Sequence, residues 1–287
     1  MISYNPKEWF TFIFRFHKSD TFIKLLPVIF GISLYCGLIA YLELEIFRLP
    51  ENSHVKNITI MHSMLGFVIS LLLVFRTNTA YDRWWEGRKL WGSLVNNSRN
   101  LALKLSVILK ENEDLLFFKK NIPYYAYVLN LHLKNQDIGL ELSDELNSTI
   151  ENKKHVPNQI AKLLFKKIND LHLQQKISSE QLLFLNPELT SFTDICGACE
   201  RIKNTPIPFS YSVFFKKFIF FYVMTLPLGY VFLLGYYTIP VVIFIFYVLA
   251  SLELIAEEIE DPFGEDENDL PTKKIAENIK KNIDEIL

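Results

Sequence analysis

One apolar stretch that ends abruptly in a polar one constrains the fold more than any other part of the sequence. Residues 58–75 are almost entirely apolar, and the polarity changes within one residue at Arg76. A helix of that length rises about 27 Å, close to the thickness of the hydrocarbon layer of a bilayer. No proline occurs between Ile58 and Asn121. The pattern therefore predicts a helix that crosses a membrane and continues beyond it.

Two further apolar regions are long enough to cross a bilayer. Residues 23–42 form a first candidate span. Residues 218–256 carry almost no charge and suffice for two crossings, with a turn predicted at residues 235–240. Together with the central stretch, these regions predict an all-α integral membrane protein with four transmembrane helices.

The placement of basic residues predicts the orientation of the chain. Lys7 and Arg15 precede the first span, and Lys216 and Lys217 precede the third. Basic flanks stay on the cytoplasmic side of a membrane. We therefore expect both termini and the long polar region between the second and third spans to be cytoplasmic.

These expectations divide the chain into five segments. They are an N-terminal cytosolic or interfacial segment (1–22), transmembrane helices one and two (23–75), a cytosolic helical region (76–217), transmembrane helices three and four (218–256), and an acidic loop with a C-terminal tail (257–287). In the cytosolic region, Ser179 is a plausible N-cap of a helix that runs towards Cys199. In the tail, the spacing of Ile275, Ile279 and Ile283 predicts a final amphipathic helix.

The sequence lacks the motifs of the common enzyme classes. We find no His-Glu-x-x-His, no glycine-rich phosphate loop and no Gly-x-Ser-x-Gly. The net charge is −2 and no basic stripe alternates with aromatic residues, so no nucleic-acid partner is indicated. Cys196 and Cys199 are interpreted as buried thiols, because no second Cys/His pair stands at the spacing of a structural zinc site.

Polar and aromatic residues follow the central span in a characteristic order. They are Arg76, Asn78, Tyr81, Asp82, Arg83, Trp84, Trp85, Glu86, Arg88 and Trp91. The segment from Cys199 to Pro208 follows in the chain, and after it comes an acidic segment around Pro262-Phe263-Gly264. In this order, the three stretches resemble the bestrophin family in its bacterial form. The plainer interpretation is a membrane exit with ordinary aromatic anchors, in which the three tryptophans lie near the membrane–water boundary.

The resemblance implies a homopentameric channel whose second span lines the pore. It places an apolar neck at Ile60, Met64 and Val68. An alignment shifted by one residue favours Phe67 instead, and His62 and Leu72 are further lining candidates. An apolar constriction stops ions because it sheds water until it widens. A competing stripe of small residues is typical of close helix packing and comprises Thr59, Ser63, Gly66 and Ser70.

The resemblance also implies two cytosolic features. A second constriction falls on Leu182 or Leu183, with Ile177 as a third choice; ordinary core packing is the alternative for each of them. The acidic loop offers possible calcium ligands, by resemblance to animal members in which calcium opens the channel. These are Glu258, Asp261, Asp266 and Asp269. The alternative is a structural loop whose carboxylates pair with Arg76, Arg83 or Arg88.

The resemblance thus implies a passive ion channel in the bacterial plasma membrane, with copies of itself, lipid and inorganic ions as its partners. Chloride is the expected ion, by resemblance. A monovalent cation channel of the same fold and a non-conducting membrane scaffold are the alternatives. The neck is uncharged and does not fix the sign of the conducted ion.

Overall fold

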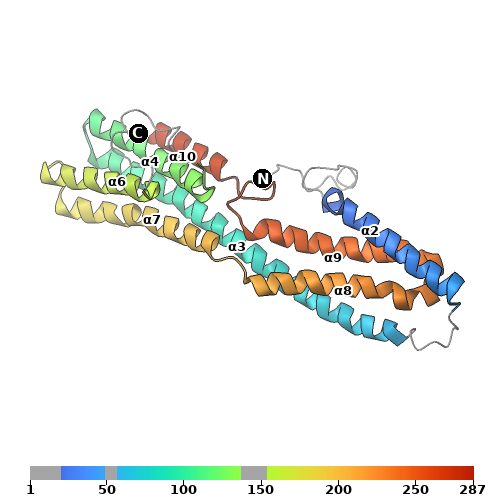
Figure 1. Ribbon diagram of the computed structural model, residues 1–287. Coiled ribbons are helices and arrows are strands. Elements are labelled where there is room, and N and C mark those ends of the chain that lie inside the picture. The colour runs from blue at the N-terminus through green and yellow to red at the C-terminus, as the bar shows by residue number, and fades with distance from the viewer. Residues whose placement is uncertain (1–20, 49–56, 137–153) are drawn as a thin grey trace.

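A single long helix, α3 (Ile58–Ile108), is the axis of the molecule. The computed structural model describes residues 21–48, 57–136 and 154–287, and these ranges are helical without strands. Helix α3 has 51 residues and is about 76 Å long. It runs through both halves of an elongated molecule (Figure 1). The predicted continuous helix across Arg76 is confirmed.

The apolar half of the molecule is a bundle of four helices. Helices α8 (Phe209–Leu234) and α9 (Thr238–Glu260) pack with the first half of α3, and α2 (Thr21–Tyr41) packs on α9 and α8 (Figure 1). By length and composition, the stretches Thr21–Ile46, Ile58–Ile108 and Phe209–Glu260 can each cross a membrane. The last of them folds back at Gly235–Tyr237, where Gly235 has φ +56°, a backbone conformation that favours glycine. Four apolar helices therefore lie together, and their number as membrane crossings stays a prediction.

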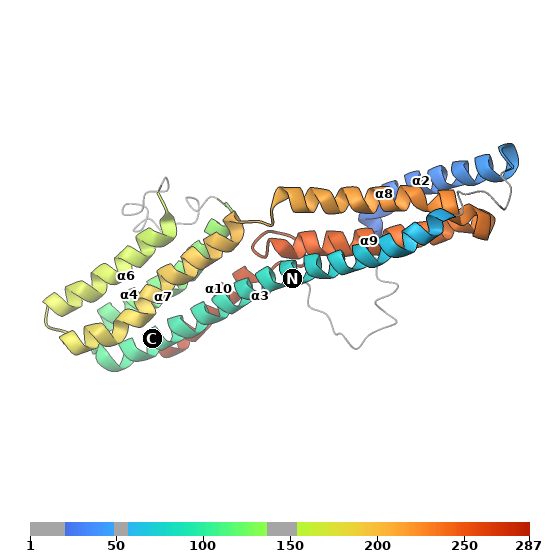
Figure 2. The same ribbon diagram turned by 90° about the horizontal axis from the view of Figure 1, so that it is seen from below.

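The polar half is a second bundle around the remainder of α3. Helices α4 (Asn112–Leu133), α6 (Val156–Leu173), α7 (Ser179–Asn204) and α10 (Thr272–Ile286) contribute to it (Figure 2). Trp91, Phe118 and Phe192 are fully buried in its core. The separate core of the apolar half includes Ile69, Val223 and Phe246. Helix α3 thus joins two independently packed hydrophobic cores.

The start of α7 corrects one sequence prediction. The N-cap of α7 is Ser178 and not Ser179: the Ser178 hydroxyl accepts from the Gln181 amide, and the Gln181 side chain accepts from the Ser178 amide. This reciprocal capping box satisfies two backbone donors at once. The predicted stripe of α10 is confirmed, because Ile275, Ile279 and Ile283 are buried. Cys196 and Cys199 are buried free thiols, also as predicted.

The third and fourth apolar helices are longer than the nearly uncharged run of 218–256. Helix α8 begins nine residues earlier, at Phe209, and α9 ends at Glu260. Charged residues flank the run on both helices, and Lys216 Nζ lies 2.9 Å from Glu257 Oε1. The helical backbone thus continues past the apolar run at the same end of both helices.

Candidate functional site: the α3 helix and its polar exit

Within the apolar half, α3 buries one face against the bundle and leaves the opposite face uncovered. Ile69 and Leu73 are 1% and 3% exposed, whereas Ile60, Met64 and Phe67 are 62%, 69% and 72% exposed. The last three follow one another at spacings of four and three residues, so they share a face of the helix. Val68 and Leu72 lie nearer the bundle: Val68 is 42% exposed and Leu72 is half-buried.

His62 does not lie on that uncovered face, which corrects its prediction as a lining residue. Its side chain is fully buried between α3 and α8. Nδ1 donates to the Ile58 carbonyl over 2.9 Å, and Nε2 lies 2.9 Å from Thr225 Oγ1. A polar group at this depth is expensive unless it is hydrogen-bonded. The partners of His62 make it a packing residue that joins two helices.

Small residues bring α3 and α8 close together, and two of them, Thr59 and Gly66, belong to the predicted stripe of small residues. A Cβ added at Gly66 would lie 2.9 Å from Tyr222 Oη, and one added at Gly229 would lie 3.1 Å from Thr59 Cγ2. Ser63 and Ser70, the other members of the stripe, are exposed. The contact with α8 therefore uses only half of the stripe and helps to set which face of α3 is free.

Arg76, at the polarity change, is a fully buried cation held by two carboxylates of α9. Its side chain is 1% exposed; Nε lies 3.3 Å from Glu253 Oε2 and Nη1 lies 2.8 Å from Glu260 Oε2. Buried charges require such partners, because desolvation otherwise makes them very costly. Arg76 thus fixes α9 against α3 where the apolar half ends. The predicted pairing of Arg76 with a carboxylate occurs here through Glu253 and Glu260 of α9, and not through Glu258, Asp261, Asp266 or Asp269.

Arg83, two turns further along, gathers three backbone carbonyls. Its guanidinium donates to the carbonyls of Glu260, Thr205 and Ile202 over 3.0, 2.6 and 2.6 Å. The planar fork of arginine suits this divergent set of acceptors, which an ammonium group cannot reproduce. Arg83 therefore joins α3 to the end of α9 and to the end of α7.

The Pro-Phe-Gly loop packs onto the next turn of α3. Trp84 Nε1 donates to the Asn268 carbonyl over 3.0 Å. Gly87 lies under the loop, and a Cβ there would be 3.0 Å from the Phe263 ring and 3.2 Å from Leu270. The absence of a side chain at Gly87 is what allows the loop to approach so closely.

The ten polar and aromatic residues after the central span divide between two faces of α3. Arg76, Arg83, Trp84 and Trp91 point into the protein, whereas the exposed members are Asn78, Tyr81, Asp82, Trp85 and Arg88. Glu86 Oε1 accepts from Arg201 Nη2 over 2.6 Å. Trp91 is fully buried in the core of the polar half, so its predicted place at the membrane boundary is wrong. Fifteen residues of helix separate it from Arg76, about 22 Å.

The carboxylates of the acidic loop make contacts within and beside the loop. Asp269 Oδ2 accepts from the Asp266 amide over 2.6 Å, and Asp261 Oδ1 accepts from the Phe263 amide over 3.3 Å. Glu258 accepts from Asn268 and pairs with Lys24. Burial raises the pKa of Asp269 to about 7. The proposed calcium ligands thus have a structural use, and calcium binding stays a prediction.

The candidates for a cytosolic constriction separate by burial. Ile177 is 3% exposed within the core of the polar half, and Leu182 packs against the same core. A side chain inside a packed core cannot face a pore, so the choice of Ile177 is wrong. Leu183 is 71% exposed on α7 and stays a prediction.

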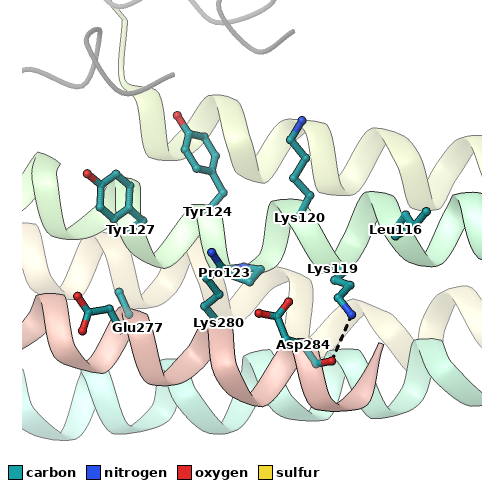
Figure 3. A pocket seen from close by; sticks show the side chains of 10 residues that line it. Leu116, Lys119, Lys120, Pro123, Tyr124, Tyr127, Glu277, Lys280 and Asp284 are labelled. Atoms are coloured by element: carbon teal, nitrogen blue, oxygen red, sulfur yellow. Dashed lines mark hydrogen bonds between the residues drawn. The ribbon is translucent and has the colours of Figure 1, made fainter. Parts of the chain in front are cut away.

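Two polar features of the second half lie outside every sequence prediction. A cavity of about 540 Å³ lies between α4 and α10, and Lys119, Lys120, Lys280 and Asp284 are among its lining residues (Figure 3). Lys119 Nζ donates to the Asp284 carbonyl there. The second feature is a cluster of His132, His155 and Glu200. These residues are 23 and 45 positions apart, and no local spacing signal connects them.

Comparison with known proteins decides the family. Residues 1–285 match the family described as bacterial/fungal bestrophin protein. The chain belongs to the bestrophin family. A Nostoc protein named voltage-dependent anion channel-forming protein alr2987 is 34% identical, with 98% of this chain and 92% of the relative covered. The Escherichia coli K12 protein named voltage-dependent anion channel-forming protein YneE is 32% identical, with 82% and 79% covered.

Solved structures agree with this assignment. A substituted form of a bacterial bestrophin homolog from Klebsiella pneumoniae superposes with a TM-score of 0.82 at 27% identity, covering 91% of this chain and 97% of that one. The assignment to the bestrophin family and the predicted all-α membrane fold are therefore confirmed. The relatives are named as channel-forming proteins and not as enzymes, in agreement with the interpretation of the sequence.

Proposed function

We propose that the chain forms a homopentameric chloride channel whose pore is lined by the uncovered face of α3. The continuity of that face carries the proposal. In the apolar half it presents Ile60, Met64, Phe67 and Leu71, and beyond Arg76 the same helical spacing brings Asn78, Asp82, Trp85 and Lys89 to the surface. A face that is apolar across the bilayer and polar beyond it suits a hydrophobic neck that opens into a water-filled vestibule.

The helical spacing favours Phe67 over Val68 as the third neck residue. Ile60, Met64 and Phe67 lie within about 60° of one another around the helix, whereas Val68 is turned by about 100° from Phe67 towards the bundle. Rings of these side chains around a five-fold axis would narrow the pore and exclude water. Such a neck gates conduction but does not select the sign of the ion.

The names of the relatives support an anion as the conducted ion. Chloride is the simplest anion that fits passive flow through an uncharged neck. The pentamer rests on the resemblance within the family. We also place the channel in the bacterial plasma membrane with both termini cytoplasmic, because basic residues flank the first and third spans on one side.

Two measurements on the purified full chain test this proposal. Native mass in detergent is expected to give five copies, and a solitary chain without conductance would support the scaffold alternative instead. In planar bilayers with asymmetric sodium chloride, the reversal potential is expected near the chloride equilibrium potential. A reversal potential near the sodium value would refute the choice of anion and support the cation alternative.

A further inference from the structure

Three side chains from separate elements converge in the polar half. His132 lies in the last turn of α4, His155 immediately precedes α6, and Glu200 lies near the end of α7. Both histidine Nε2 atoms lie 2.6 Å from the same carboxylate oxygen, Glu200 Oε1. The two rings are 4.6 Å apart between centroids. The side chains are 29%, 32% and 29% exposed, so the cluster is within reach of solvent.

The geometry points to a binding site for a divalent transition-metal ion, and we propose zinc as the ion that probes it. Two imidazoles and one carboxylate form a ligand set that zinc accepts, with a fourth position left to water. Magnesium and calcium prefer oxygen ligands, so a site with two imidazole nitrogens does not suit them. Among the described residues, these ligand atoms are the one group of three His, Cys, Asp or Glu ligands that lie within 4.8 Å of one another.

The ligands need only a small movement to hold the ion. Bonds of about 2.0–2.2 Å in a tetrahedral site place neighbouring ligand atoms about 3.3 Å apart. The present N···O separations of 2.6 Å must therefore widen by about 0.7 Å. His132 and Glu200 are on helices, so rotation about their side-chain bonds is the movement that would supply this shift.

The hydrogen bonds of His155 show which proton a bound ion would displace. Its Nδ1 accepts from the Asn158 amide over 3.2 Å as the N-cap of α6, so Nε2 carries the proton that it donates to Glu200. A metal on Nε2 takes the place of that proton and moves a proton to Nδ1. The long capping bond to Asn158 is then lost. Metal binding is thereby coupled to the first turn of α6.

The site is also connected to α3 through its neighbours in the chain. Arg201 follows Glu200 directly and pairs with Glu86 of α3. The carbonyl of Ile202 accepts from Arg83. An ion that fixes Glu200 to α4 and α6 would hold the end of α7 where it meets the long helix. This inference does not depend on the identity of the conducted ion.

Zinc titration of the full chain, free of affinity tag and stripped with a chelator, tests the proposal. Isothermal titration in detergent is expected to show one high-affinity zinc per chain. His155→Asn is the sharpest variant, because asparagine is a good N-cap and leaves no imidazole. Both this variant and Glu200→Gln are expected to bind zinc at least tenfold more weakly. The matched control His172→Asn alters another partly buried histidine, which contacts the Ile177 carbonyl, and is expected to leave affinity unchanged.

Cobalt provides a second readout that does not depend on stability. The visible absorption of bound Co²⁺ is expected to be that of a four-coordinate nitrogen and oxygen site in the wild type and to be lost in His155→Asn. Size-exclusion profiles matched to the wild type establish that each variant is folded. Absence of zinc binding to the wild type, or equal affinity of the wild type, His155→Asn and Glu200→Gln, would overturn the proposal.

Discussion

The buried cation at the polarity change allows a quantitative prediction. Arg76→Met keeps a side chain of similar volume but removes the guanidinium that pairs with Glu253 and Glu260, whose side chains are 5% and 13% exposed. Removing one partner of a buried ion pair costs about 3–5 kcal/mol. At roughly 2–4 °C per kcal/mol for chains of this order of size, a loss of about 3 kcal/mol lowers Tm by roughly 6–12 °C.

The exposed pair of Arg201 and Glu86 is the matched control. Its side chains are 66% and 42% exposed, and such pairs contribute about 0–1 kcal/mol. Arg201→Gln is therefore expected to lower Tm by no more than about 4 °C. Thermal unfolding of both variants in one detergent, followed by size-exclusion chromatography, measures the difference. Adding Glu253→Gln to Arg76→Met is expected to restore part of the stability. Equal losses in the two single variants would refute the claim that burial makes Arg76 important.

Three further predictions follow from individual contacts. Gly87→Ala places a Cβ 3.0 Å from the Phe263 ring and is expected to lower the free energy of unfolding by about 1–3 kcal/mol. Faster proteolysis of the Pro-Phe-Gly loop would show this loss, and slower or unchanged cleavage would contradict it. Burial by itself would raise the pKa of Asp114, but hydrogen bonds from Lys167 and Lys176 outweigh it and hold that pKa below its usual value. Asp114→Asn should therefore lower Tm at pH 7, and the difference from wild type should vanish as the pH falls through that lowered pKa. Burial raises the pKa of Asp269 to about 7, so the stability that Asp269 contributes declines as the pH rises from about 4 to 7. In chelator, Asp269→Asn should flatten that decline and be the more stable protein at pH 8; a parallel pH profile would contradict it.

Much of the fold could be predicted because its signals are local. An apolar run, a sudden change at Arg76 and the absence of proline were enough for α3, and the spacing of Ile275, Ile279 and Ile283 was enough for α10. The orientation of α3 about its own axis was not predictable in the same way. Its membrane half is apolar on every side, so periodicity gives no face; tertiary contacts with α9 and α8 set it, including the close approaches at Gly66 and Gly229.

The errors in the candidate site have the same origin. His62 was a lining candidate because an ionisable residue at membrane depth is usually functional, but Thr225 of α8 supplies the partner that buries it. Ile177 and Trp91 belong to the core of the polar half, which forms only when helices from distant parts of the chain pack together. The cluster of His132, His155 and Glu200 joins positions far apart in the chain, and only tertiary packing reveals it.

Reaction of single cysteines with a water-soluble thiol reagent tests most directly whether the uncovered face of α3 lines the conducting path. Met64→Cys lies on that face, and Ile69→Cys lies on the buried face of the same helix. The native Cys36, Cys196 and Cys199 are buried, so they are expected to react little with the reagent. In planar bilayers, the reagent is expected to reduce current through Met64→Cys and to leave current through Ile69→Cys unchanged. Block of Ile69→Cys with no effect on Met64→Cys would contradict the account.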